Sequence, residues 1–278
     1  MKSILITGSN RGIGLGLVKA LIKNRTIPKH IIATCRQPNQ AKELQNLAES
    51  NKNIHILQLD LLNFDSYAEF SKIVATIVKN DGLNVLINNA GVGHKFVRIG
   101  QVKTEPLIDS FFINCVAPIM MSKEMLPFLK QAAESNSELP IGVERAAIIN
   151  ISSSLASIAD NNDGGYYAYR CSKAALNAAT KSLSIDVKPY NILANCLHPG
   201  WVKTRMGGNK APLEVDDACS QIINTIQNFS NENTGRFYSY NGEELKCYYL
   251  PSPTTHQANS LTCELGDFLR LDQVYWFR

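Results

Sequence analysis

Short apolar runs alternate with longer stretches of helical periodicity along most of this chain. Strand-like runs fall at about 3–7, 30–35, 54–59, 83–87, 145–151, 192–197 and 236–240. Amphipathic helical patterns fall near 12–24, 39–50, 64–80, 105–131, 166–187 and 213–229. Strands that alternate with helices in this order are typical of a parallel sheet covered on both faces. The pattern therefore predicts an α/β fold: a single doubly wound domain with a mainly parallel, seven-stranded sheet flanked by helices.

The alternation of strands and helices stops near residue 246. Before that point, the polar stretch from Glu134 to Glu138 is expected to be a surface loop, not a domain boundary. From 247 to 278 the chain mixes polar residues with Pro251 and Pro253 and shows no clear period. Chain termini are often poorly ordered unless other contacts hold them, which favours a loose tail over a packed substrate lid. We therefore predict one domain over residues 1–246 and a C-terminal tail over residues 247–278.

Composition and charge narrow the choice of partners and compartment. The chain has 278 residues, 45% of them hydrophobic, and a formal net charge of +4 without a block of lysine and arginine. These values favour a packed core and give little support to binding of nucleic acid or of a membrane surface. The seven cysteines form no C-x-x-C pair, and no apolar run approaches the ~18 residues of a membrane span. We expect a cytoplasmic protein with reduced thiols.

The first cluster of glycines lies between the first strand-like run and the first helical pattern. Glycine at positions 8, 12 and 14 permits a tight turn and lets a phosphate approach the start of the helix. The spacing differs from the G-x-G-x-x-G fingerprint of dinucleotide sites. An ordinary structural turn is therefore an equal alternative for this cluster taken alone.

Two arginines indicate which dinucleotide such a turn would bind. The second strand-like run ends at Arg36 without the acidic residue that normally holds a free ribose 2′-hydroxyl. Arg36, together with Arg11 in the glycine turn, offers guanidinium groups suited to a 2′-phosphate. The alternative is that either arginine is only a solvated surface charge. The pair favours NADP(H) as the cofactor.

Tyr169 and Lys173 are four positions apart, so they share one face of a predicted helix. A free phenol titrates near pH ~10, and a nearby cation favours the phenolate. We therefore expect Lys173 to lower the pKa of Tyr169 and make it a proton donor near neutral pH. Alone, such a pair is more often a solvated helix face. Here it follows a serine run at 152–154 in a chain that also carries a candidate cofactor turn.

Several motifs, taken in order, resemble those of the short-chain dehydrogenase/reductase family, and within it the sniffer-like carbonyl reductases. The resemblance covers about residues 1–246. Each motif is ambiguous by itself, whereas together and in order they are highly specific. The motifs are Thr7-Gly8-x-x-x-Gly12-x-Gly14, Asp60-Leu61, Asn88-Asn89-Ala90-Gly91, Asn114, Ser153, Tyr169-x-x-x-Lys173 and Pro199-Gly200-Trp201-Val202-x-Thr204.

This resemblance implies a Rossmann-type fold, NADPH-dependent reduction of an aldehyde, ketone or quinone, and a small-molecule carbonyl substrate. It is compatible with a homodimer or a monomer. The implied catalytic residues are Asn114, Ser153, Tyr169 as proton donor and Lys173. With Arg11 and Arg36, the implied cofactor-binding residues are Gly8, Ser9, Asn10, Gly12, Ile13, Gly14, Asp60, Leu61, Asn88, Ala90, Gly91, Tyr169, Lys173, Pro199, Gly200, Val202 and Thr204.

The chain departs from the family pattern around the catalytic serine. Ala156 stands where the family usually carries a glycine. The stretch from Ser153 to Tyr169 is longer than the usual spacing. Two neighbouring hydroxyls, Ser152 and Ser154, are therefore alternatives to Ser153 as the catalytic serine.

Other chemistries receive less support from the sequence. The chain contains no G-x-S-x-G motif and no H-E-x-x-H motif, and its histidines lack metal-ligand spacing, so we expect no catalytic metal. His94 and His198 are candidates for contact with a substrate, although a lone histidine is more often structural. Loops near 92–96, 155–165 and 201–208 are predicted to line an apolar pocket.

Two alternatives to a reductase remain. One is an NADP(H)-sensing binding protein with little turnover, against which the complete serine, tyrosine, lysine and asparagine set argues. The other is an NADP-linked epimerase or dehydratase, which usually carries a larger substrate region than the remainder of this chain offers.

Overall fold

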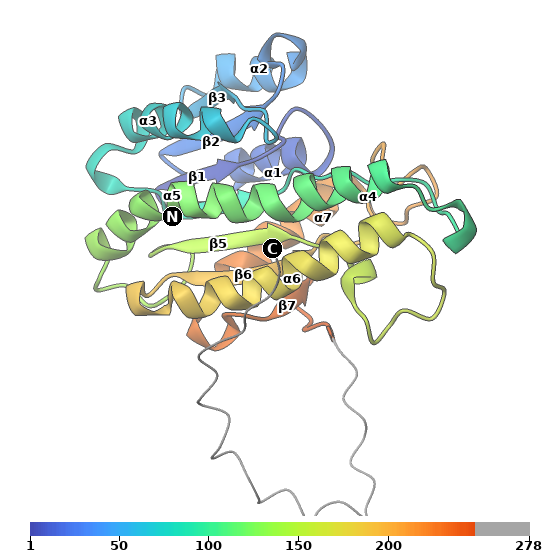
Figure 1. Ribbon diagram of the computed structural model, residues 1–278. Coiled ribbons are helices and arrows are strands. Elements are labelled where there is room, and N and C mark those ends of the chain that lie inside the picture. Colours follow the sequence, from blue (N-terminus) through green and yellow to red (C-terminus); the bar gives the residue numbers. More distant parts are fainter. Residues whose placement is uncertain (248–278) are drawn as a thin grey trace, which may run out of the picture. The chain divides into compact units, whose positions relative to one another are not determined.

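The computed structural model describes residues 1–247, in which seven strands form one sheet. The strands are β1 (Ser3–Ile6), β2 (His30–Cys35), β3 (Ile54–Gln58), β4 (Val85–Asn88), β5 (Ala147–Ile151), β6 (Leu193–His198) and β7 (Phe237–Ser239). They lie in the order β3-β2-β1-β4-β5-β6-β7, and every neighbouring pair is parallel (Figure 1). The predicted α/β class with a seven-stranded parallel sheet is confirmed.

Seven α-helices cover both faces of this sheet in the described part of the chain. They are α1 (Gly12–Lys23), α2 (Lys42–Ser50), α3 (Tyr67–Val78), α4 (Thr104–Phe111), α5 (Ala117–Ser135), α6 (Tyr167–Asp186) and α7 (Val215–Gln227). One hydrophobic core packs α1, α2 and α7 on the sheet, and a second core packs α3 and α5 on the opposite face. Figure 1 shows α4, α5 and α6 in front of the sheet with α1 and α7 behind it.

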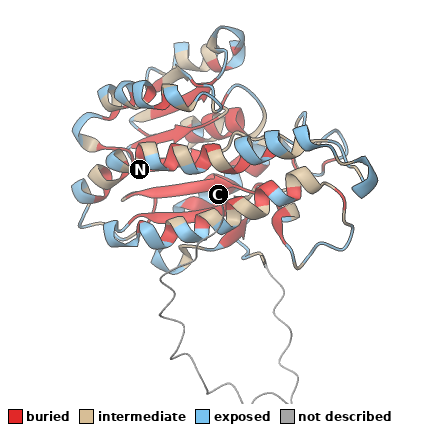
Figure 2. Ribbon diagram, viewed as in Figure 1, coloured by how far each residue is buried: buried red, intermediate tan, exposed pale blue. Residues whose placement is uncertain are grey.

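Alternate residues of the central strands enter opposite cores, because successive side chains of a strand point to opposite faces. Ile4 of β1 packs against the helices α1 and α7, whereas Leu5 packs on the side of α3 and α5. Ile31 and Ile32 divide in the same way in β2. All four side chains are fully buried, and Figure 2 shows the sheet as the buried centre of the domain. Burial on both faces explains why these strands appear as continuous apolar runs.

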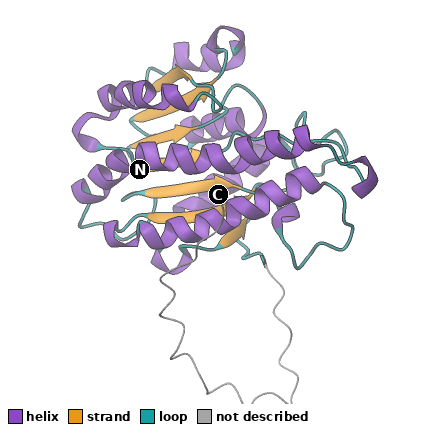
Figure 3. Ribbon diagram, in the orientation of Figure 1, coloured by secondary structure: helices purple, strands orange, loops and turns teal. Residues whose placement is uncertain are grey.

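The helix predicted over 105–131 differs most from the structure. It divides into α4, a π-helical segment at Phe112–Val116, and α5, which extends to Ser135. Figure 3 draws α4 and α5 as one continuous run of helix. The polar stretch that begins at Glu134 therefore starts inside a helix, because Ala132 and Ala133 are buried and extend the packed face of α5. No helix within residues 1–247 is long and apolar enough to cross a membrane. The predicted tail lies outside the described residues except for its first position, and the domain boundary stays a prediction.

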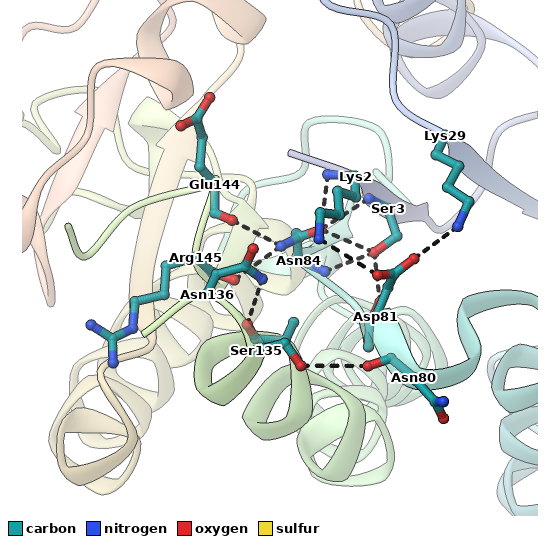
Figure 4. A network of polar contacts seen from close by, with 12 residues as sticks. Lys2, Ser3, Lys29, Asn80, Asp81, Asn84, Ser135, Asn136, Glu144 and Arg145 are labelled. Atoms are coloured by element: carbon teal, nitrogen blue, oxygen red, sulfur yellow. Dashed lines mark hydrogen bonds and ion pairs between the residues drawn. The ribbon is translucent and has the colours of Figure 1, made fainter. Parts of the chain in front are cut away.

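Asn84 joins three strands at their amino ends. Its side chain is fully buried, and its Oδ1 accepts hydrogen bonds from the backbone N–H groups of Lys2 (2.9 Å) and Ser3 (3.0 Å). Its Nδ2 donates to the carbonyl oxygens of Glu144 (2.9 Å) and Arg145 (3.1 Å). Figure 4 shows this amide between the start of β1 and the segment that leads into β5. One side chain thereby hydrogen-bonds backbone groups of both segments, among them the buried N–H of Ser3.

Replacing this amide should destabilise the fold. Asn84→Ala removes the bonds and leaves buried backbone groups unsatisfied, each at a cost of roughly 1–3 kcal/mol, so we expect unfolding to require about 3 kcal/mol less. Urea denaturation followed by circular dichroism measures the difference. Asn80→Ala is the matched control, because Asn80 is exposed and contributes only its backbone carbonyl to Ser135. Equal stability of the two variants would contradict the role of Asn84.

Candidate active site

The candidate site lies at the carboxyl ends of the strands, between β1 and β4. β1 pairs with β2 on one side and with β4 on the other, so the order of strands changes direction there. In open α/β sheets, ligands bind in the crevice at such a switch point. The glycine turn follows β1, and the motif at 88–91 ends β4. The fold thus brings these two predicted cofactor motifs together.

The glycine turn has a tight backbone conformation that residues with side chains could not easily adopt. Gly8 and Gly12 adopt φ angles of 71° and 54°, a region that favours glycine. A Cβ atom on Gly14 would lie 2.2 Å from the carbonyl oxygen of Gly8. α1 begins at Gly12, so the unpaired N–H groups of its first turn lie at this site. The turn therefore fits a pyrophosphate group, which needs close approach to backbone donors.

Two residues that sequence reasoning did not place in the site hold this turn in position. The Thr7 hydroxyl oxygen accepts hydrogen bonds from the backbone N–H groups of Asn89 (3.0 Å) and Ala90 (3.1 Å). The Asn89 side-chain amide donates to the carbonyl oxygens of Thr7 (2.8 Å) and Gly8 (3.3 Å). Both residues belong to the motifs on which the resemblance rests. Their place in those motifs could have identified them as residues of the site.

Arg11 and Arg36 lie where the sequence predicts a phosphate clamp. Both are exposed, and Arg36 directly follows β2. Burial lowers the pKa of Arg11, and the positive charges of Arg205 and Arg36 lower it further. Asp60 is exposed and lies just beyond the end of β3. Its carboxylate accepts a hydrogen bond from the backbone N–H two residues later. The structure therefore gathers positive charge, not negative charge, near the glycine turn.

Asn88 lies below the cleft. Its buried side-chain amide donates to Asn150 Oδ1 (2.8 Å) and Ser122 Oγ (3.2 Å), and Asn150 in turn donates to Thr180 Oγ1 (2.8 Å). These bonds link β4 and β5 to the helices α5 and α6. The predicted cofactor contact is therefore not supported for the Asn88 side chain, because its amide is engaged inside the core.

Tyr169 and Ser153 come together at the carboxyl end of β5. Burial raises the pKa of the Tyr169 phenol, and hydrogen bonding with the Ser153 side chain lowers it. Ser152 instead donates to Asn177 Oδ1 at 2.6 Å, and Ser154 is exposed. Of the three serines, Ser153 is the one that meets the phenol.

Lys173 lies on α6, four residues after Tyr169, and it is buried. Its Nζ donates to the carbonyl oxygen of Ile151 (2.7 Å) and lies 5.9 Å from the centroid of the Tyr169 ring. Burial lowers the pKa of Lys173 to about 8. The expectation that Lys173 lowers the pKa of Tyr169 is wrong for this structure, since burial is the largest effect on the phenol and raises its pKa. The physical reason is that the ammonium group is directed at a strand carbonyl.

Asn114 is fully buried in the π-helical segment between α4 and α5. Its Oδ1 accepts from the Val92 N–H (2.8 Å), and its Nδ2 donates to the Val92 carbonyl (2.9 Å) and to Ser172 Oγ (3.0 Å). A Cβ on Gly91 would lie 3.0 Å from Asn114 Oδ1 and 3.6 Å from Lys173 Nζ. The absent side chain of Gly91 therefore lets the predicted catalytic asparagine and lysine lie close together. A π-helical insertion at such a position is common at functional sites.

The loop after β6 reaches the glycine turn from the other side. Gly200 has a φ of 84°, and a Cβ there would lie 2.4 Å from Leu213 Cδ1. Val202 is buried and forms a bridge with Leu213. Thr204 Cγ2 lies 3.5 Å from the position that a Cβ on Gly12 would take. The predicted nicotinamide loop and the predicted pyrophosphate turn are thus in contact.

A cavity of about 270 Å³ opens beside the candidate proton donor. Two predicted pocket loops meet at its edge, where the Phe96 and Tyr166 rings lie edge to face with centroids 5.0 Å apart. A Cβ on Gly165 would lie 2.2 Å from the Phe96 ring, and the Arg98 guanidinium lies 5.0 Å from the centroid of that ring. The lining of the cavity includes His94, Val97, Val102, Pro106, Tyr166 and Tyr169.

Both histidines singled out in the sequence place a ring nitrogen in a buried position. His94 Nε2 and His198 Nδ1 have no hydrogen-bond partner among residues 1–247. His94 also contributes to the lining of the cavity. His198 ends β6, and burial lowers its pKa to about 4.

Comparison with known proteins agrees with this geometry. The family model for short chain dehydrogenase matches residues 2–214, so the chain belongs to the short-chain dehydrogenase family. It is an oxidoreductase, and the resemblance predicted from the motifs is confirmed.

Two solved structures and one curated relative illustrate the similarity. The carbonyl reductase Sniffer of D. melanogaster is 53% identical, with a TM-score of 0.88 over 88% of this chain and 99% of that one. The NADPH-bound carbonyl reductase from chicken fatty liver is 37% identical, with a TM-score of 0.84 over 88% and 99% of the two chains. The C-signal protein of Myxococcus xanthus is 40% identical over 171 residues, 62% of this chain and 96% of that protein.

Acidification should destabilise the domain through His198. Its pKa is about 4 in the folded protein against ~6.5 in an unfolded chain, so the unfolded state takes up the proton first as the pH falls. The stability contributed by the neutral ring is complete above pH ~6.5 and is lost as the pH falls toward about 4.

Between about pH 7.5 and about pH 5 this linkage amounts to about 2 kcal/mol. We expect His198→Gln to lose that much less stability than the wild type over the same interval. Urea denaturation of both proteins at the two pH values is the measurement. Parallel losses in the two proteins would show that His198 is not the group responsible.

Proposed function

We propose that the protein reduces the carbonyl group of a small molecule with NADPH, and that Tyr169 donates the proton. The observation that carries this proposal is the hydrogen bonding between the side chains of Ser153 and Tyr169, with Tyr169 also lining the cavity. The similarity to carbonyl reductases, one of them described as NADPH-bound, supports the same reaction and the same cofactor.

The chemistry follows from where charge develops. NADPH, when bound, supplies the hydride, and negative charge then grows on the carbonyl oxygen of the substrate. Donors within hydrogen-bonding reach of that oxygen stabilise the charge. Tyr169 supplies the proton, and Ser153 supplies a second hydrogen bond that polarises the carbonyl.

Lys173 lies close to the proposed proton donor. Burial raises the pKa of the phenol and lowers that of the lysine to about 8. The Lys173 Nζ donates to the Ile151 carbonyl oxygen and lies 5.9 Å from the centroid of the Tyr169 ring. Asn114 holds the turn at Gly91 and Val92, against which the Lys173 ammonium group lies.

The residues of the cofactor cleft fit NADP(H). The glycine turn accommodates a pyrophosphate, and Arg11 and Arg36 offer guanidinium groups for the 2′-phosphate. Within residues 1–247 neither arginine forms an ion pair, so both side chains are available to an anion.

The cavity beside Tyr169 has a largely apolar lining, which includes Val97, Val102, Pro106 and Tyr166. Such a lining favours aromatic or aliphatic aldehydes, ketones and quinones over sugars or peptides. Oxidation of NADPH followed by absorbance across a panel of these compounds tests the proposed activity. A cytoplasmic location and a homodimer remain predictions from the sequence.

Removing the phenol hydroxyl should nearly abolish turnover. General acid catalysis contributes about 10²–10⁴-fold, so Tyr169→Phe should lower kcat by at least about a hundredfold while the protein stays folded and binds NADPH. Tyr190→Phe is the matched control, because Tyr190 is an exposed tyrosine in a different part of the domain. A kcat for Tyr169→Phe near that of the wild type would remove Tyr169 from the mechanism.

The same assay separates the three serines. Ser153→Ala should lower kcat by roughly a hundredfold, the usual effect of deleting one donor to a developing oxyanion. Ser154→Ala should have little effect, because Ser154 is exposed. A larger loss in Ser152→Ala or Ser154→Ala than in Ser153→Ala would assign the role to a neighbour.

Arg36 should determine the preference for NADPH over NADH. A charge-assisted hydrogen bond contributes roughly 1.5–3 kcal/mol, so Arg36→Ala should raise the Kd of NADPH by about ten- to a hundredfold. NADH carries no 2′-phosphate, and its Kd should hardly change. Arg36→Asp should shift the preference toward NADH by adding an acceptor for the ribose hydroxyls. Isothermal titration measures the Kd of both cofactors in the wild type and the two variants. An equal increase in the Kd of NADPH and NADH would argue against a 2′-phosphate site at Arg36.

A further inference from the structure

The loop after β6 carries a third guanidinium group to the glycine turn. Gly12 has no side chain, and Thr204 Cγ2 lies 3.5 Å from the position of its absent Cβ. The residue after Thr204 is Arg205, and the residue before Gly12 is Arg11. The contact between the two segments therefore places the backbones of Arg205 and Arg11 next to the same point of the cleft.

The electrostatics agree with this placement. After burial, the positive charge of Arg205 is the next largest effect that lowers the pKa of Arg11, ahead of the charge of Arg36. Within residues 1–247, none of these three guanidinium groups forms an ion pair. Lys203, two positions earlier in the same loop, does pair with Glu214. The arginine cluster is therefore left with uncompensated positive charge, which an anion between the groups would relieve.

The loop that bears Arg205 is held in a defined shape. Trp201 Nε1 donates to the Gly207 carbonyl oxygen at 2.7 Å, and the Gly207 N–H donates to Thr204 Oγ1 at 3.0 Å. The Gly208 N–H donates to the Thr204 carbonyl oxygen at 2.8 Å. These bonds close a compact turn around Arg205, so little additional ordering of the backbone is needed when its side chain meets a ligand.

We propose that Arg205 binds the pyrophosphate of the dinucleotide, opposite the glycine turn. The pyrophosphate is favoured over the 2′-phosphate because Arg205 follows Thr204, which lies against Gly12 at the start of α1, whereas the 2′-phosphate is assigned to Arg36 at the end of β2 together with Arg11. This inference rests on the proposed NADP(H) cleft, but it does not depend on Tyr169 as proton donor. It predicts a division of labour in which Arg36 selects the cofactor and Arg205 contributes affinity common to NADPH and NADH.

Binding of NADPH, NADH and adenosine 2′-monophosphate to the full-length protein tests the assignment without any turnover. Arg205→Ala should raise the Kd of NADPH and of NADH by about the same factor, roughly tenfold, and leave that of adenosine 2′-monophosphate unchanged. Arg36→Ala should show the opposite pattern, with adenosine 2′-monophosphate and NADPH weakened and NADH spared. Arg205→Lys should recover part of the lost affinity, because it restores the charge without the planar fork.

Lys210→Ala is the matched control. Lys210 is an exposed cation of the same β6–α7 connection, and its removal changes the net charge by the same amount. We expect unchanged Kd values for this variant, and thermal melts should show that every variant is folded. Loss of NADPH affinity alone in Arg205→Ala, no loss at all, or an equal loss in Lys210→Ala would each overturn the assignment. A folded wild-type protein that binds neither dinucleotide would instead overturn the proposed function.

Discussion

The hydrogen bonds that Thr7 forms with the Asn89–Ala90 turn hold together the two halves of the site. β1 ends in the glycine turn, and β4 ends in the segment that leads to Gly91, Asn114 and Lys173. A Cβ on Gly8 would lie 2.9 Å from the Ala90 Cβ, so the two strand ends touch with no space for a side chain. Because the polar groups at this contact satisfy one another, the glycine turn proposed to bind phosphate and the segment that lies against Lys173 are held in a fixed relative position.

Burial then determines the acid–base properties of the site. A low-dielectric environment disfavours charged forms, so it raises the pKa of the Tyr169 phenol and lowers that of Lys173. The sequence suggested that the cation would act directly on the phenol, but the Lys173 ammonium is bonded to the Ile151 carbonyl. Burial thus keeps the phenol protonated, which is the form that the proposed proton donor requires.

Predictions from the sequence succeeded where a local pattern has a single physical solution. Continuous apolar runs such as Ile4–Ile6 require burial on two faces, and strands that alternate with helices require a parallel sheet. Predictions were less complete where a residue type is compatible with more than one environment. Asn88 belongs to a cofactor motif, and the sequence did not indicate that its amide also bonds Asn150 and Ser122 in the core. The π-helical segment that carries Asn114 has the same apolar spacing as an ordinary helix, so periodicity could not distinguish the two.

The sequence by itself determined the order of elements, the fold class and the set of polar residues that the carboxyl ends of the strands would bring together. Only the tertiary structure decided which of three serines meets Tyr169, where the Lys173 ammonium points, and that the loop carrying Arg205 touches the glycine turn. The reason is that periodicity is a property of neighbouring residues along the chain. Hydrogen-bond partners, burial and repulsion between charges depend on distances between residues far apart in sequence, which exist only once the sheet and its loops have assembled.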